Sequence, residues 1–306
     1  MTERLRVVLT ALLFLAAAVS TASGTDPIRL ETGDGRFVFR DPPQFTGKNV
    51  PVWYFKPEAY TPDTPIVFVM HGASRNADGY RDAWRYLAAH HNLLVLAPEF
   101  SKDDFPKSWT YNLGNLARPF KAGNPVHFRP RKDWTYPIID RIFERVRTEI
   151  STRQTRFALY GHSAGGQFVH RYMTFTGGAK VAFAITANAG WYTLPDYNVP
   201  FPYGLAGTDL PQSHLAQAFA KNLVVLLGEN DTKQGRYLRR TPEAMEQGSN
   251  RLARGKLYFE TTRRKAGAMG TPFAWRLVFV PDVGHSNAGI APMAAKLVRE
   301  AFKTRR

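Results

Sequence analysis

Short apolar runs alternate with amphipathic stretches along most of this chain, and this alternation restricts the possible folds more than any other feature. Six runs are almost continuously apolar, as is typical of strands buried on both faces of a sheet. They lie at residues 65–70, 92–98, 156–160, 181–188, 222–228 and 274–280. Two earlier runs, at 36–40 and 51–56, alternate between polar and apolar residues. This pattern predicts leading antiparallel strands with one solvated face.

Helical periodicity fills the intervals between these runs. The spacing predicts helices over 79–90, 136–150, 164–174, 212–221, 250–265 and 291–303. Strand and helix therefore follow one another as in βαβ units, which indicates a mostly parallel, doubly wound α/β sheet. No internal repeat, Gly/Ser linker or shift in composition separates a second domain. We therefore predict a single domain over residues 25–306.

The first residues have the pattern of a targeting segment. Two arginines precede the apolar run 7–19, which at 13 residues is shorter than the roughly 20 that span a bilayer. Small residues follow, so we predict a signal peptide over 1–24, cleaved near Ala22 or Gly24. An uncleaved membrane anchor is the alternative. Without paired arginines, the general export route is favoured, and we expect a periplasmic or secreted protein with no stable membrane insertion after cleavage.

The chain is strongly basic, with 41 Lys and Arg against 25 Asp and Glu and a formal net charge of +16. Such a charge attracts acidic polymers, lipid headgroups or nucleic acid, or simply keeps the surface solvated. The basic residues are scattered and accompany no nucleic-acid-binding signature, so no nucleic-acid partner is expected. The absence of cysteine excludes disulfides and thiolate metal sites. No H-E-x-x-H motif or similar ligand spacing occurs, so neither a metal nor another cofactor is expected.

Residues 161–165 read Gly-His-Ser-Ala-Gly and fit the pattern G-x-S-x-G. The pattern alone is weak, because a serine between two glycines can simply be a small residue in a tight turn. Its context is more specific: the motif follows the apolar run 156–160 and opens the predicted helix 164–174. This strand, turn and helix are what a nucleophile elbow requires. We therefore take Ser163 as the candidate nucleophile.

A serine hydroxyl needs a base to accept its proton and a carboxylate to orient that base. Asp231 follows the predicted strand 222–228, and His285 follows the predicted strand 274–280. Because parallel strands end at one edge of a sheet, both side chains should lie beside Ser163. Glu229 and Asp282 are rival carboxylates, although Glu229 is closer to its strand and Asp282 is only three residues from the histidine.

His162 is the rival base, but a side chain adjacent to the serine on a tight turn points away from it.

The chemistry also requires two donors for the oxyanion of the tetrahedral intermediate. We expect them to be the backbone N–H groups of Ala164, directly after the serine, and Ala73, in the sequence His-Gly-Ala-Ser after the third strand. Gly72 lets that backbone approach closely. The sequence His-Gly-Ala-Ser, residues 71–74, could also be an ordinary exit from a strand.

The stretches VMHGASRNADGYRDAW, LYGHSAGG, GENDT and VGHSNAG resemble the α/β-hydrolase superfamily, specifically secreted serine esterases related to polyhydroxybutyrate depolymerases and feruloyl esterases. The resemblance extends from about residue 37 to the carboxyl end and implies an α/β-hydrolase fold without a large cap domain. It implies Ser163 as nucleophile, Asp231 as orienting acid, His285 as base, and Ala73 and Ala164 as oxyanion donors. The chain departs from many secreted members by having no disulfides and no appended substrate-binding module.

Two long segments, 99–133 and 189–211, are aromatic and rich in Pro and Gly, and loops of this length are usually functional. We expect an open cleft lined by Trp191, Tyr192, Trp109, Tyr111 and Trp134. The same rings could equally be packing anchors of the loops. We expect an anionic substrate chain to be bound by Arg75, Asn112, Asn115 and Arg118.

The predicted activity is hydrolysis of a carboxylic ester, in a small-molecule or oligomeric substrate of oligoester or hydroxycinnamoyl type that can be anionic. An amidase or peptidase acting on an acidic polymer would use the same three side chains. A noncatalytic binding protein that retains the fold is the alternative from another class.

Overall fold

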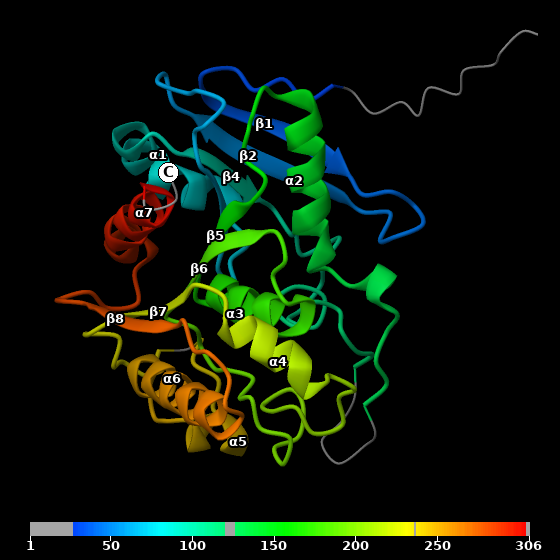
Figure 1. Cartoon of the computed structure of the whole chain (residues 1–306), viewed down its shortest axis with the longest axis vertical. Coiled ribbons are helices and arrows are strands. Elements are labelled where there is room, and N and C mark those ends of the chain that lie inside the picture. The colour runs from blue at the N-terminus through cyan, green and yellow to red at the C-terminus, as the bar shows by residue number, and fades with distance from the viewer. Residues whose placement is uncertain (1–26, 120–125, 236, 304–306) are drawn as a thin grey trace, which may run out of the picture.

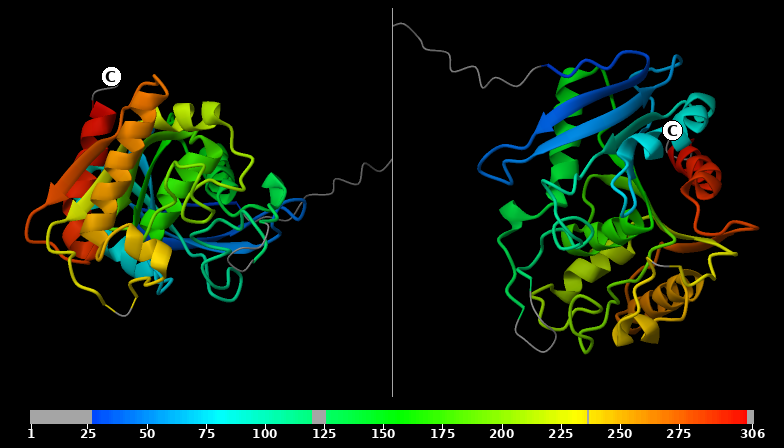
Figure 2. Two further views of the ribbon diagram at one scale, coloured as in Figure 1. Left: turned by 90° about the horizontal axis from the view of Figure 1, so that it is seen from below. Right: turned by 180° about the vertical axis from the view of Figure 1, so that it is seen from behind.

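The computed structural model describes residues 27–119, 126–235 and 237–303, which form a sheet covered by helices on both faces (Figures 1 and 2). The sheet has eight strands in the order β1-β2-β4-β3-β5-β6-β7-β8. β1 pairs antiparallel with β2 and β2 with β4, and every other neighbouring pair is parallel. The predicted α/β-hydrolase fold with leading antiparallel strands is confirmed. The predicted signal peptide, 1–24, lies outside the described residues.

Each apolar run identified in the sequence forms a strand, and the ends differ by three residues at most. The strands are β1 (Gly33–Arg40), β2 (Asn49–Lys56), β3 (Ile66–Met70), β4 (Leu94–Pro98), β5 (Phe157–His162), β6 (Val181–Ala187), β7 (Leu223–Gly228) and β8 (Arg276–Val280). Side chains of a strand alternate between the two faces of a sheet. In β3, Ile66, Phe68 and Met70 pack into one core, and Val67 and Val69 into the other. Both faces are buried, which explains the continuously apolar run.

The helices form the two outer layers. α1 (Ala77–His91) and α7 (Asn287–Lys303) pack against one another and against one face of the sheet. The other face carries α2 (Pro137–Glu149), α3 (Ala164–Thr176), α4 (Gln212–Phe219) and α6 (Arg251–Ala268) (Figure 1). The sequence did not predict α5 (Pro242–Glu246), because five residues are too few to show helical periodicity.

The start of α7 was predicted wrongly. Its periodicity predicted a start at residue 291, just before Pro292, but the helix begins at Asn287 and contains that proline. The local reason is a cap: the Ser286 hydroxyl accepts a hydrogen bond from the Gly289 N–H at 3.1 Å. The carbonyl of Ser286 also accepts the Ile290 N–H at 3.1 Å. This capped start fixes the residue that precedes it, His285.

Among the helices in the described ranges, none combines the length and the apolar character needed to cross a bilayer.

The glycines that flank Ser163 allow β5, α3 and β3 to approach one another closely. A Cβ on Gly161 would lie 2.2 Å from the Gly165 carbonyl oxygen, and a Cβ on Gly165 would lie 2.1 Å from the Met70 carbonyl oxygen. Both positions are therefore closed to any larger residue unless the backbone moves.

We predict that Gly165→Ala destabilises the protein by about 1–3 kcal/mol, because the added methyl group must push α3 away from β3. The matched control is Gly267→Ala in α6, where nothing lies within 4 Å of the added Cβ. That substitution should leave the stability unchanged or raise it by up to about 1 kcal/mol. Urea unfolding of both variants measures the difference, and equal stabilities would contradict the close packing described above.

Candidate active site

Ser163 occupies a strained turn between β5 and α3. Its backbone has φ 60° and ψ −115°, a conformation that residues other than glycine rarely adopt. The Ser163 N–H donates to the Ala187 carbonyl at 3.0 Å, and its carbonyl accepts the Gln167 N–H at 3.0 Å. These bonds hold the turn between the end of β6 and the first turn of α3. The side chain remains partly exposed at the carboxyl edge of the sheet.

A chain of two hydrogen bonds joins Ser163 to Asp231 through His285. The His285 Nε2 atom lies 3.0 Å from Ser163 Oγ, and its Nδ1 atom lies 2.7 Å from Asp231 Oδ2. The Asp231 side chain is 1% exposed and that of His285 is 29% exposed. Because an ionised carboxylate can only accept, Nδ1 donates to Asp231 and Nε2 is left to accept the serine proton. The arrangement can activate Ser163 as a nucleophile.

The rival residues lie elsewhere. Glu229 and Asp282 are exposed, and within the described ranges neither side chain bonds to His285. His162 is buried, and its Nδ1 atom lies 3.1 Å from the hydroxyl of Tyr80. Burial holds the pKa of His162 well below its usual value, so this ring is neutral. It packs 4.6 Å from the His285 ring, measured between centroids, and does not bond to Ser163.

The loop after β3 reaches the serine at Gly72. A Cβ on this glycine would lie 3.9 Å from Ser163 Cβ and 2.8 Å from the Tyr80 hydroxyl. No carbonyl in the described part of the chain accepts the backbone N–H of Ala73 or of Ala164. The oxyanion assignment requires that neither amide be used in this way within the fold.

His71 ties this loop to the segment that follows β4. Its Nδ1 lies 3.0 Å from the Gly72 carbonyl oxygen, and its Nε2 accepts the Phe100 N–H at 3.0 Å. The ring stacks on Tyr111, whose hydroxyl donates to the His71 carbonyl at 2.7 Å. Burial lowers the pKa of His71 to about 3, so the ring is neutral at ordinary pH and keeps one donor and one acceptor. These contacts fix the position of the candidate oxyanion loop.

The expectation that Trp191 and Tyr192 line an open cleft is wrong. Tyr192 is 0% exposed and stacks on Tyr258 at 4.3 Å between ring centroids. Trp191 is 3% exposed and has the guanidinium of Arg171 over its ring at 4.1 Å. Tyr111 and Trp134, at 0% and 6% exposed, are buried as well. These four rings are packing anchors of the two long loops, and of the five aromatic residues proposed only Trp109 is not buried.

Arg75 and Asn112 also make protein contacts in place of a free binding surface. The guanidinium of Arg75 donates to three loop carbonyls, those of Phe100, Phe105 and Lys107, at 2.7, 3.1 and 2.8 Å. The Asn112 amide donates to the Gln167 side chain at 2.9 Å. The sequence could not show this, because the acceptors are backbone atoms of distant residues. Asn115 likewise donates to a carbonyl, that of Asp133 at 2.9 Å, and Arg118 is exposed.

A pocket of about 580 Å³ adjoins His285 and Asp231 on the side of α6. It is lined by Asn230, Asp231, Thr232, Lys233, Gly235, Tyr237, Arg251, Gly284 and His285. Two of these residues are cationic, and sequence reasoning identified neither. Lys233 follows Asp231 by two residues, so its position in the loop after β7 is a signal in the sequence for a cation beside the site. Nothing in the sequence places Arg251 near Asp231.

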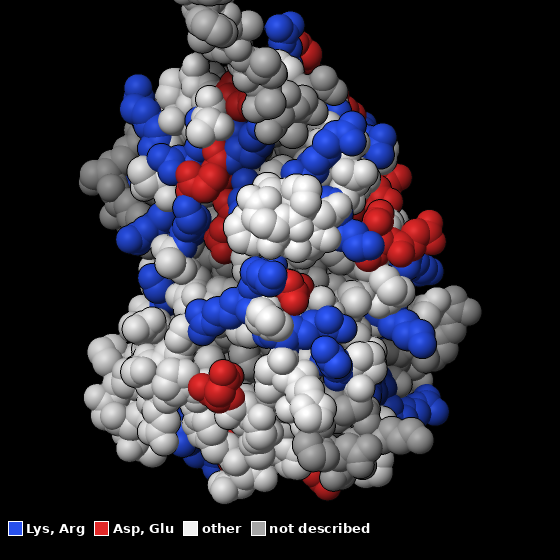
Figure 3. Space-filling view, turned by 90° about the vertical axis from the view of Figure 1, so that its right-hand side faces the viewer, with Lys and Arg blue, Asp and Glu red and all other residues white. Residues whose placement is uncertain are grey.

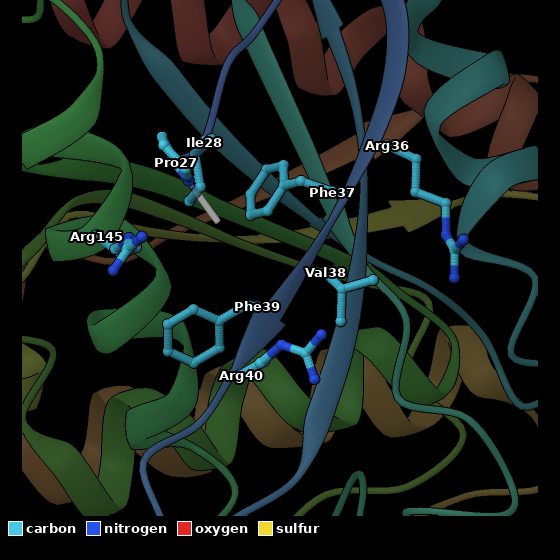
Figure 4. A pocket seen from close by; sticks show the side chains of 8 residues that line it. All are labelled: Pro27, Ile28, Arg36, Phe37, Val38, Phe39, Arg40 and Arg145. Atoms are coloured by element: carbon cyan, nitrogen blue, oxygen red, sulfur yellow. The ribbon is translucent and has the colours of Figure 1, made fainter. Parts of the chain in front are cut away.

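A second hollow, of about 340 Å³, lies on β1 at the edge of the sheet, four strands away from β5 (Figure 4). Phe37 and Phe39 point toward Ile28 and Arg145, whereas Arg36 and Arg40 extend on the other side of the strand. None of its lining side chains is a nucleophile or a general base. It is therefore not part of the candidate active site.

Positive charge is spread over the face of the molecule that Figure 3 shows. Figure 3 shows one face on which Lys and Arg spread across the upper and middle parts, with acidic side chains among them. In the described residues, no group of three or more His, Asp and Glu is arranged to hold a metal ion.

Two solved structures are similar to this chain in both sequence and fold. Poly(aspartic acid) hydrolase-1 from Sphingomonas sp. KT-1 is 44% identical, with a TM-score of 0.82 over 88% of this chain and 99% of that chain. LpqC, a poly(3-hydroxybutyrate) depolymerase from Bordetella parapertussis, is 36% identical, with a TM-score of 0.81 over 87% of this chain and 89% of that chain.

A ferulic acid esterase is 12% identical, with a TM-score of 0.53 over 90% of this chain and 99% of that chain, so the likeness concerns the fold alone. No protein-family model and no curated protein matches the chain.

The contact between Gly72 and Tyr80 gives a test of the oxyanion loop. Gly72→Ala places a methyl group 2.8 Å from the Tyr80 hydroxyl, so the loop or the buried Tyr80 side chain must shift. We expect kcat for a p-nitrophenyl ester to fall about 100-fold, because a displaced oxyanion donor costs about that much. Combining it with Tyr80→Phe removes the clashing oxygen and should recover most of this loss. A double variant no better than Gly72→Ala would contradict the assignment.

Proposed function

Because the chain belongs to the α/β-hydrolase superfamily of serine hydrolases, we propose that it hydrolyses a carboxylic ester through an acyl-enzyme formed on Ser163. The observation that supports this most directly is the pair of hydrogen bonds, 3.0 and 2.7 Å long, from Ser163 Oγ through His285 to Asp231. Distance and orientation suit transfer of the serine proton to Nε2. No cofactor enters the reaction.

In the first half of the reaction, His285 takes the Ser163 proton as Oγ attacks the ester carbonyl carbon. The tetrahedral intermediate then collapses: the bond to the alcohol breaks, and His285 returns the proton to the leaving oxygen. In the second half, His285 takes a proton from water, the hydroxide attacks the acyl-serine, and the acid leaves as Ser163 recovers its proton. Asp231 keeps the imidazole in the required tautomer and stabilises its charged form.

The oxyanion that forms in each half carries a full negative charge beside Ser163. We assign its two donors to the backbone N–H groups of Ala164 and Ala73. Ala164 is the first residue of α3, so the positive end of the helix dipole also faces the oxyanion. Donors already in place before the reaction stabilise the intermediate without reorganisation.

A second candidate is hydrolysis of amide bonds in an acidic polymer. Its support is the 44% identity to a poly(aspartic acid) hydrolase together with the exposed cation Lys233 in the pocket beside His285. A polymer of aspartic acid carries one carboxylate per unit, and such a chain would be attracted by a net charge of +16. The acyl-serine mechanism is the same for both candidates.

We also propose that the protein acts outside the cytoplasm. The support is the signal-peptide pattern of residues 1–24.

The first experiment compares mature wild type and Ser163→Ala on p-nitrophenyl acetate, butyrate and octanoate. Loss of the nucleophile should lower kcat by about 10⁶-fold. The two proteins are shown to be equally folded by circular dichroism. Labelling with a fluorophosphonate should mark wild type and leave Ser163→Ala unmarked. Turnover that is unchanged in the variant would exclude Ser163 as the nucleophile.

A second experiment tests whether the pocket favours anionic substrates. We expect Lys233→Met to lower kcat/KM for the mono-p-nitrophenyl ester of succinate relative to the butyrate ester, by about three- to tenfold, because a cation near the carboxylate is lost. The difference should shrink at high salt. Lys296→Met on α7 is the matched control for net charge, since Lys296 is exposed and outside the pocket lining. An unchanged ratio for Lys233→Met would exclude this lysine from substrate selection.

A further inference from the structure

A buried arginine contacts the carboxylate that orients His285. Arg251 Nη1 lies 3.5 Å from Asp231 Oδ1, and the two side chains are 5% and 1% exposed. The other oxygen of the same carboxylate, Oδ2, accepts from His285 at 2.7 Å. Each carboxylate oxygen therefore has its own cationic or donor partner. Rotation of the carboxylate would break both contacts, so the arginine fixes the oxygen that faces the imidazole.

The backbone of α6 also places Arg251 beside Asp231. Arg251 is the first residue of α6, and Asn250 caps the helix by accepting the Ala253 N–H at 2.9 Å. The next N–H of this turn, that of Leu252, donates to the Asp231 carbonyl at 3.3 Å. The amino terminus of α6 is thus bonded to the Asp231 loop, and both its dipole and its first side chain present positive charge to that residue.

Local packing alone does not account for a charged group at this position. Burial lowers the pKa of Arg251, which means that its charged form is costly here, and Asp231 opposes that effect. Its Nε atom is buried, and no atom of the described residues bonds to it. A buried ion pair is often no more stabilising than apolar residues of the same volume. What this pair does determine is the orientation of the carboxylate that faces His285 and the net charge around it.

We propose that Arg251 is a positioning residue, which fixes the Asp231 carboxylate and offsets its field so that His285 stays unprotonated, and able to act as a base, at lower pH. This inference rests on the proposed function. A carboxylate in contact with an imidazole favours the protonated ring, and a cation on the far side of the carboxylate opposes this. Removal of the arginine should therefore leave His285 protonated, and inactive as a base, up to a higher pH.

The other groups that face His285 do not duplicate this effect. From β5, His162 is neutral because it is buried, and Tyr80 of α1, bonded to it, is neutral because burial raises its pKa. From the loop after β7, Lys233 is a cation at the exposed side of the pocket, and in the loop of His285 itself Asp282 is exposed to solvent. Exposed charges are screened, whereas the buried Arg251 is screened much less.

The test is the pH dependence of kcat/KM on p-nitrophenyl butyrate, a neutral substrate. We expect Arg251→Met to move the acid limb up by about one pH unit, and Arg251→Lys, which keeps the charge, to leave it near its wild-type position. An NMR titration of the imidazole nitrogens of His285 should show the same displacement without any turnover. Arg263→Met, at an exposed site in the same helix, controls for net charge and should move neither curve.

If the pH profile of kcat/KM and the NMR titration of Arg251→Met coincide with those of wild type, the proposal is overturned. So would equal displacements for the methionine and lysine variants, because the charge would then not be the cause. If Arg251→Met does not fold, Arg251→Lys and Arg251→Gln provide the same comparison. Failure of the proposed function would be recognised separately: wild type itself would show no turnover that depends on Ser163, while the NMR titration would still report on Arg251.

Discussion

Ser163 depends on the close approach of three backbone segments. A Cβ at Gly161 would meet the carbonyl of Gly165, and one at Gly165 would meet the carbonyl of Met70, so β5, α3 and β3 are in direct backbone contact. This contact holds Ser163 at φ 60° and places it at the carboxyl edge of the sheet. Because the helix starts immediately after the serine, the hydroxyl and the first helical N–H share one location. The remaining parts of the site need only reach that edge.

Sequence reasoning succeeded where geometry follows from topology. The six apolar runs predict six parallel strands, and parallel strands end at the same edge of a sheet, so the loops after β5, β7 and β8 all lie at that edge. Hence the sequence alone predicts that Asp231 and His285, 54 residues apart, lie at the same edge as Ser163. The strand ends and helix starts were less accurate. The start of α7 depends on the Ser286 cap, which periodicity does not report.

The same reasoning failed for side chains whose environment depends on distant partners. Trp191 and Tyr192 follow a strand at the ligand edge, as a cleft residue would. Tyr192 is buried because α6 supplies Tyr258 against its ring and the side chain of Gln247 bonds to its backbone at 2.9 and 2.8 Å. Trp191 is buried against Tyr203, 4.7 Å away between ring centroids. Arg251 is the opposite case: its charge and helical position predict an exposed residue, but the first turn of α6 brings it to Asp231. The local sequence pattern predicts neither the burial of Trp191 and Tyr192 nor the contact of Arg251 with Asp231.

Buried arginines explain how long loops are held in a chain without cysteine. Arg75 joins the segment after β4 through the carbonyls of Phe100, Phe105 and Lys107. Arg254 in α6 donates to the carbonyls of Gly190, Arg239 and Gly248, and so connects two loops to that helix. The fork of a guanidinium suits this task, because several donors leave one rigid group. Part of the net charge of +16 is therefore structural, and the charge available to an anionic substrate is that of exposed residues such as Lys233. Electrostatic selection at this site should accordingly depend on a few positions around the pocket and much less on the total charge.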